Sequence, residues 1–188
     1  MAKLRPHPDI AEVLITEPRI HQRIATLARD IGRCYDGEEV TIITVLNGSI
    51  VFLGELLHRL PMPTRLDSIV ARSYGASTTS SGRVRTRRPW QLPLKGQHVL
   101  LVDDILDTGR TLKLIRDRIR RERPASVRTC VLLDKPTRRE VDIHADFTGF
   151  EIPDKFVVGY GLDFAERYRN LPYIAVLKPE IYRSRGTE

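Results

Sequence analysis

The sequence predicts an α/β protein with a central, mostly parallel sheet flanked by helices. Two observations support this fold class. Short β-branched apolar runs, which are typical of buried strands, alternate with segments of helical periodicity. Polar turns that contain Gly, Asn or Asp end several of these apolar runs. In parallel sheets, ligands bind at the carboxyl ends of the strands, so we expect the functional groups in these turns.

The N-terminal half of the chain predicts two helices and two strands. The first helix carries apolar side chains at helical spacing and stops at Asp36-Gly37. The first strand, VTIITVL, is β-branched and short enough to be buried. Residues 75–96 lack periodicity and predict a long loop, with a short hairpin near Val84. The elements in order are a helix over 18–35, a strand over 40–46, a helix over 50–60 and a strand over 65–74.

The C-terminal half predicts further strands around one helix. HVLLVDD runs directly from apolar residues into two carboxylates, and the helix after it ends before Pro124. Neither an internal repeat nor a linker divides the chain, so we expect a single domain over residues 1–188. The predicted elements are a strand over 98–104, a helix over 111–123, and strands over 126–135, 155–163 and 173–178.

Composition and charge limit the class of protein. With 188 residues, 41% of them hydrophobic and 29% charged, the chain has the composition of an ordinary globular domain. The net charge of +7 favours anionic partners, either phosphorylated metabolites or nucleic acid. Cys34 and Cys130 lack metal-ligand spacing and are expected to be reduced, partly buried thiols. The N-terminal residues lack the apolar core of a signal peptide, and we expect a cytoplasmic protein without a membrane partner.

The stretch VLLVDDILDTGRTL places an anion-binding turn beside carboxylates. A turn at Gly109 leads into a helix, where backbone N–H groups are unpaired. Thr108 and Thr111 add hydroxyl groups, although either residue could simply cap the helix. Asp103 and Asp104 would repel a phosphate unless Mg²⁺ or hydroxyl groups lay between them. A ligand with a phosphate at one end and a diol in the middle, such as ribose 5-phosphate, meets both demands.

Two other interpretations of this stretch fit less well. It lacks the spacing and the Lys of a Walker A loop, which argues against an ATPase. Receiver domains of response regulators also carry Asp-Asp after an apolar strand, but close to their start, whereas about a hundred residues precede Asp103. Asp146, at roughly the distance of a phospho-accepting residue, does not follow a predicted buried strand.

The stretch resembles the phosphoribosyl pyrophosphate (PRPP) binding motif of type I phosphoribosyltransferases. LNGSIVFLGEL at 46–56 resembles the pyrophosphate-binding loop of this family, and RSYG at 72–75 resembles the start of its flexible catalytic loop. LLDKPTRR at 132–139 and residues 146–177, which include FEIPDKFVVGYGLD, resemble the purine-binding half of its hypoxanthine-guanine members. The resemblance covers roughly residues 10–180.

This resemblance implies an enzyme of purine salvage. Such enzymes convert hypoxanthine or guanine and PRPP to IMP or GMP and pyrophosphate, with Mg²⁺ as cofactor, and are usually dimers or tetramers. The resemblance also implies a flexible loop over about 73–95 and a small hood made of N-terminal residues and about 140–188. An alternative is an RNA-binding regulatory protein on the same fold. The purine-binding residues favour the enzyme, so nucleic acid is not the expected partner.

The resemblance assigns roles residue by residue. Asp103 and Asp104 would hold the ribose hydroxyls, directly or through Mg²⁺-bound water, and Asp163 would bind a second Mg²⁺. Asp107 would accept or steer the proton on purine N7, unless it only caps the helix. The peptide bond before Asn47 is expected to be cis. The 5′-phosphate would lie on Thr108, Gly109, Arg110 and Thr111, the pyrophosphate on Asn47, Gly48 and Arg169, and the purine near Lys135, Lys155, Phe156, Val157 and Asp163, with Ser73 and Tyr74 beginning the catalytic loop.

Some charged residues have no role in this scheme. Asp134 stands next to Lys135, where it would either tune the lysine or face solvent. The arginines of the predicted loop and helix are expected to be solvated for the most part. They are Arg83, Arg85, Arg87, Arg88, Arg116, Arg118, Arg120, Arg121 and Arg123.

Overall fold

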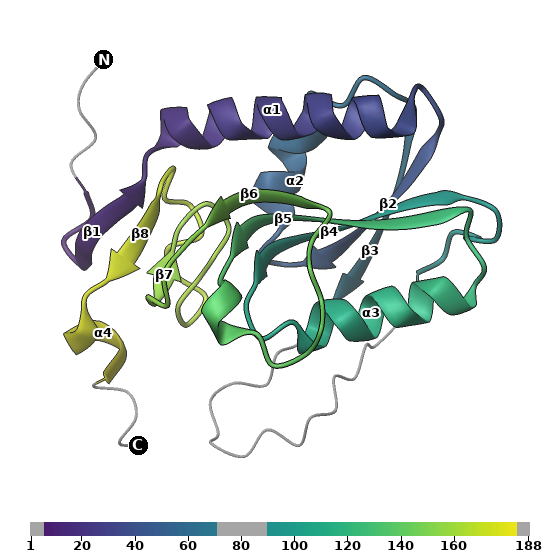
Figure 1. Cartoon of the computed structure of the whole chain (residues 1–188). Helices are drawn as coiled ribbons and strands as arrows, with labels where there is room; N and C mark the ends of the chain where they lie inside the picture. Colours follow the sequence, from purple (N-terminus) through teal and green to yellow (C-terminus); the bar gives the residue numbers. More distant parts are fainter. Residues whose placement is uncertain (1–5, 71–89, 184–188) are drawn as a thin grey trace.

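A five-stranded parallel sheet forms the centre of the protein, as the computed structural model of the chain shows over residues 6–70 and 90–183 (Figure 1). The strand order is β3-β2-β4-β5-β6, and every pairing in it is parallel, which confirms the predicted fold class. The strands are β2 (Val40–Leu46), β3 (Thr64–Val70), β4 (His98–Leu106), β5 (Ser126–Asp134) and β6 (Phe147–Glu151). The long helices are α1 (Glu17–Tyr35), α2 (Ile50–Leu57) and α3 (Arg110–Arg121).

Helices cover both faces of this sheet. Helices α1 and α2 lie on one face and α3 lies on the other (Figure 1). The alternation of side chains along β4 follows this arrangement: Leu100 and Val102 pack in the cluster that contains α1 and α2, whereas Val99 and Leu101 pack in the cluster that contains α3. A strand buried on both faces reads as a continuous apolar run, which explains why β4 was predicted.

A small antiparallel sheet lies beside the carboxyl ends of the large one (Figure 1). Its order is β1-β8-β7, with β1 (Ile10–Ile15), β7 (Val157–Val158) and β8 (Ile174–Leu177), and the short helix α4 (Pro179–Arg183) follows. The predicted strand 173–178 therefore belongs to this sheet rather than to the parallel one. The hood was expected from about residue 140, but β6 still pairs with β5 in the large sheet.

The strand predicted over 155–163 is wrong in its length. Only Val157 and Val158 are extended, because the backbone then takes positive φ angles of 97°, 52° and 103° at Gly159, Tyr160 and Gly161. These angles lie outside the extended region, so the chain turns back toward β8. The pattern also missed β1, β6, α4 and the 3₁₀ helix Pro136–Arg138, all of which are short.

Other element bounds differ by a few residues. The second helix ends at Leu57 rather than 60, and α3 ends at Arg121. Most of the loop predicted over 73–95, including Ser73, Tyr74 and the hairpin near Val84, lies outside the described residues. Both cysteines are free: Cys130 is buried and Cys34 is exposed. Among the described helices, none combines the length and the apolar character that a membrane span requires.

Candidate active site

The turn between β4 and α3 leaves backbone donors available for an anion. We call residues 107–111 the phosphate loop. Gly109 is the N-cap of α3 and has φ of 83°, a left-handed conformation that glycine adopts without steric cost. Within the described part of the chain, α3 has no side-chain cap, so neither Thr108 nor Thr111 serves as one. The first N–H groups of the helix, at Arg110 and beyond, therefore remain free to bind a phosphate.

Two neighbouring carboxylates lie near the carboxyl end of β4: Asp103 is buried and Asp104 is half-buried. Asp103 is 7% exposed, and the N–H of Asp104 donates to its Oδ1 at 3.0 Å. Burial, and then the neighbouring Asp104 carboxylate, raise the pKa of Asp103 well above its usual range. Burial raises the pKa of Asp104 as well. A Cβ at Gly48 would overlap the Asp104 carboxylate, so the 47–48 turn lies directly against this carboxylate and a larger residue would displace it.

The groups expected at the pyrophosphate lie around this turn. The Leu46–Asn47 peptide bond is cis, as the resemblance implied. Gly161 lies against the Gly48 carbonyl, and Arg169 donates to the Gly161 carbonyl at 2.9 Å. Arg169 also pairs with Asp163 at 2.8 Å. The structure thus brings together the 47–48 turn, Asp104, and the pair Asp163 and Arg169 from three separate segments.

The structure brings together only some of the residues expected at the purine. Lys135 is 7% exposed and its Nζ lies 3.8 Å from Asp154. Phe156 keeps 41% of its surface exposed and stacks on Tyr182, with 5.1 Å between ring centroids. Val157 is buried, and its backbone pairs with β8. Lys155 is placed elsewhere: its Nζ pairs with Glu12 of β1 at 2.7 Å.

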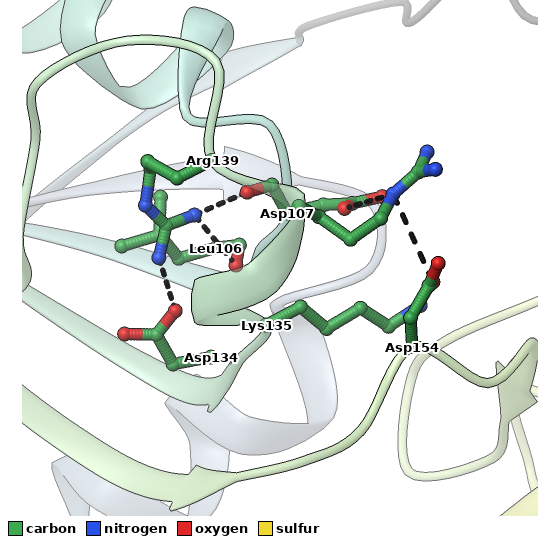
Figure 2. A network of polar contacts seen from close by, with 7 residues as sticks. Leu106, Asp107, Asp134, Lys135, Arg139 and Asp154 are labelled. Atoms are coloured by element: carbon green, nitrogen blue, oxygen red, sulfur yellow. Dashed lines mark hydrogen bonds and ion pairs between the residues drawn. The ribbon is translucent and has the colours of Figure 1, made fainter.

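An ion-pair chain connects Asp107 to the purine-side residues. The Asp107 carboxylate lies 3.2 Å from Nε of Arg138, which lies 3.8 Å from Asp154, the partner of Lys135 (Figure 2). Because the carboxylate faces Arg138, capping of α3 is not its role here. Sequence reasoning missed Arg138 and Asp154. Arg138 lies just beyond the carboxyl end of a predicted strand, a position that could have indicated its role.

The acidic residues fit Mg²⁺ that arrives with a phosphate ligand. Within residues 6–70 and 90–183, no group of three or more Asp, Glu, His or Cys side chains is close enough to bind a metal ion by itself. Mg²⁺ is usually bound by one or two carboxylates, with waters and substrate phosphates as its other ligands. Asp103, which is buried, and Asp104, which is half-buried, are neighbouring carboxylates, and a cation would relieve their repulsion. Asp163 is less free, because Arg169 and the Glu166 N–H occupy its two oxygens.

Replacing Asp103 with Asn should stabilise the ligand-free protein at neutral pH. The raised pKa means that the folded state holds a proton that the unfolded chain releases near pH 4, so the Asp103 contribution to stability falls as pH rises above about 4. Asn removes this loss. We expect Tm to increase by about 2–4 °C per kcal/mol gained at pH 7.5, and the difference from wild type to vanish near pH 4. Thermal melts at both pH values measure this, and a lower Tm at pH 7.5 would contradict it.

Comparison with known proteins agrees with this geometry. A family model described as the phosphoribosyl transferase domain matches residues 12–165. The hypoxanthine-guanine phosphoribosyltransferase of Streptococcus pneumoniae is 44% identical over 174 residues, which are 93% of this chain and 97% of that protein. The bifunctional protein TilS/HprT of Listeria monocytogenes is 45% identical, and this chain spans 27% of its length.

A solved structure matches over nearly the whole chain. It is a mutant hypoxanthine phosphoribosyltransferase from Trypanosoma cruzi, complexed with the product IMP. The TM-score is 0.90 at 39% identity, with 96% of this chain and 98% of the other covered. Likeness of both sequence and backbone over this length goes beyond a shared fold class. The chain therefore belongs to the phosphoribosyltransferase family, and within it to the hypoxanthine-guanine members.

Proposed function

We propose that the protein is a hypoxanthine-guanine phosphoribosyltransferase, which converts hypoxanthine or guanine and PRPP to IMP or GMP and pyrophosphate. One observation carries the proposal. At a single edge of the parallel sheet, the free N–H groups of the phosphate loop lie beside the carboxylates of Asp103 and Asp104. Ion pairs through Arg138 and Asp154 connect the same loop to Lys135. A phosphoribosyl ligand and a 6-oxopurine together need these three kinds of group.

Different residues of the site would bind different parts of the substrates. Thr108–Thr111 would bind the 5′-phosphate through backbone N–H and hydroxyl groups. Asp103 and Asp104 would accept hydrogen bonds from the ribose hydroxyls, which carry no charge that the carboxylates would repel. Lys135 would donate to the purine 6-oxo oxygen. Adenine suits this site poorly, since it has an amino donor at that position.

The reaction breaks the bond from C1′ to the pyrophosphate oxygen and forms a bond from C1′ to purine N9. Positive charge grows on the ribose, and negative charge grows on the leaving group. Arg169 and the backbone of Asn47-Gly48 would stabilise the leaving pyrophosphate. Mg²⁺ held at Asp103, Asp104 and Asp163 would supply further neutralising charge to the phosphates. Asp107 would take the proton from purine N7.

A turnover assay tests the proposal directly. Hypoxanthine, guanine, xanthine and uracil are offered with PRPP, in the presence of MgCl₂ or EDTA. We expect nucleotide from hypoxanthine or guanine, none from uracil, and loss of turnover in EDTA. A salt-dependent RNA binding curve on the same sample tests the alternative function. Tight, sequence-selective RNA binding without nucleotide formation would overturn the proposal.

The proposal includes further expectations about the native protein. We infer a homodimer or homotetramer, located in the cytoplasm, whose loop over about 73–95 covers the reacting centre. Size-exclusion chromatography with light scattering measures the oligomeric state. Protection of the loop from proteolysis by PRPP, Mg²⁺ and an unreactive purine analogue tests the loop, and equal cleavage with and without these ligands would count against it.

A further inference from the structure

Segment 135–140 holds the backbone carbonyls at the start of the phosphate loop. The carbonyl of Leu106 accepts from the Lys135 N–H at 3.0 Å and from the Arg139 guanidinium at 3.1 Å. The next carbonyl, of Asp107, also accepts from Arg139 (Figure 2). The carbonyl after that, of Thr108, accepts from the Glu140 N–H at 3.0 Å. Three consecutive peptide carbonyls therefore point toward one segment that lies about thirty residues further along the chain.

Arg139 is buried behind the loop and is paired there. Its side chain is 13% exposed, and its guanidinium forms an ion pair with Asp134, whose side chain is 12% exposed. A Cβ at Gly109 would lie 3.1 Å from Cδ of Arg139, so the side chain also packs against the loop. Asp134 had been expected to tune Lys135 or to face solvent, but the structure makes it the partner of Arg139. A buried ion pair is a weak source of stability, which favours a positional role for this one.

The direction of these carbonyls determines the direction of the donors. In a trans peptide unit the C=O and the following N–H point in opposite directions. Because the carbonyls of residues 106–108 face segment 135–140, the N–H groups of residues 107–109 face away from it. Successive N–H groups directed to one side form a concave anion site. Arg139 shares the Leu106 carbonyl with the Lys135 N–H, and it is the donor to the Asp107 carbonyl. Arg139 therefore orients chiefly the peptide plane between Asp107 and Thr108.

We propose that Arg139 is a positioning residue for the 5′-phosphate of the ribosyl substrate. It orients the peptide plane between Asp107 and Thr108 before the ligand binds, and Asp134 holds its guanidinium in place. The Arg139 guanidinium bonds to the backbone carbonyls of Leu106 and Asp107 and to Asp134, so its effect would reach the ligand through the loop. The inference rests on the proposed function, because it takes the loop ligand to be a phosphoribosyl compound.

Ribose 5-phosphate is the probe that isolates this effect, because it carries the phosphate and the diol but neither base nor pyrophosphate. Its Kd is measured by isothermal titration calorimetry. For Arg139→Met we expect Kd to rise by about 10–100-fold, as for other residues that orient a binding group without touching the ligand. In steady-state assays KM for PRPP should rise by a similar factor, whereas KM for hypoxanthine stays within about twofold. Arg139→Lys should give an intermediate Kd, since an ammonium group cannot reproduce the fork of donors.

A double variant separates positioning from stability. Arg139→Met alone leaves Asp134 buried without its partner and should lower Tm. Asp134→Leu combined with Arg139→Met removes both charges, so we expect Tm to recover. The Kd for ribose 5-phosphate should stay raised by about 10–100-fold, because the Asp107 carbonyl still lacks its donor. Recovery of wild-type Kd together with Tm would overturn the proposal.

Arg23 provides a matched control. It lies on α1, on the opposite face of the sheet from α3, and its guanidinium donates to the carbonyls of Thr148 at 2.6 Å and Gly149 at 2.8 Å. Arg23→Met therefore removes the same kind of contact, and should lower Tm without changing Kd for ribose 5-phosphate. A wild-type protein that neither turns over nor binds ribose 5-phosphate would contradict the proposed function. An active wild type with an unchanged Kd in the double variant would contradict only the role of Arg139.

Discussion

Asp107→Asn should lower kcat by about 10²–10⁴-fold and leave KM for PRPP unchanged. The carboxylate can take the proton from purine N7 as the new bond to C1′ forms, and an amide cannot act as this base. Asn has nearly the same size and can still accept from Arg138, which lies 3.2 Å away. The 5′-phosphate would bind the residues that follow, so its site is retained. Steady-state kinetics with hypoxanthine and PRPP measure both parameters.

Asp154→Asn is the matched control for this substitution. Asp154 contacts the same arginine at 3.8 Å and is half exposed, but it has no proton to accept in the reaction. An exposed ion pair contributes about 0–1 kcal/mol, so we expect kcat to change by less than about fivefold. If Asp107→Asn keeps the wild-type kcat and only lowers Tm, the carboxylate serves the fold rather than the reaction. Equal losses in both variants would instead assign the effect to the ion pairs that connect Asp107, Arg138, Asp154 and Lys135.

The sequence predicted those parts of the candidate site whose residues are neighbours along the chain. VTIITVL and the Asn-Gly turn after it lie within a few residues of each other, and β2 spans the predicted 40–46. The phosphate loop was predicted for the same reason, since a turn at Gly109 and the start of α3 are adjacent in the chain. The carboxyl-end rule for parallel sheets then placed Asp103 and Asp104 beside it.

Contacts between distant segments were not predicted. Arg138 and Arg139 contact Asp107 of the phosphate loop from 31 and 32 positions further along the chain. Their sequence pattern does not indicate which acidic or carbonyl group they contact. The small sheet was not predicted for the same reason. Its strands β1 and β8 are far apart in the sequence, and neither has enough apolar alternation to indicate its partner. The ion pair between Lys155 and Glu12 is a further contact between distant segments that the sequence did not indicate.

Lys135→Met should lower kcat/KM for hypoxanthine by about 10- to 150-fold. A hydrogen bond from a charged donor contributes about 1.5–3 kcal/mol, and this variant removes the cation aimed at the 6-oxo oxygen. Met has a similar length, and the Lys135 N–H keeps its bond to the Leu106 carbonyl, so the phosphate loop is retained. We therefore expect an unchanged KM for PRPP.

The comparison of kcat/KM for hypoxanthine with KM for PRPP is thus the decisive measurement for Lys135. A loss of kcat/KM for hypoxanthine at an unchanged KM for PRPP means that the lysine contacts the base, because a general defect would change both parameters. Lys155→Met is the contrasting variant. The Lys155 Nζ pairs with Glu12, and the lysine side chain is 41% exposed. We therefore expect kcat/KM for hypoxanthine to change by at most about threefold. If Lys155→Met shows the larger hypoxanthine-specific loss, the exposed lysine reads the 6-oxo group and Lys135 serves only to pair with Asp154.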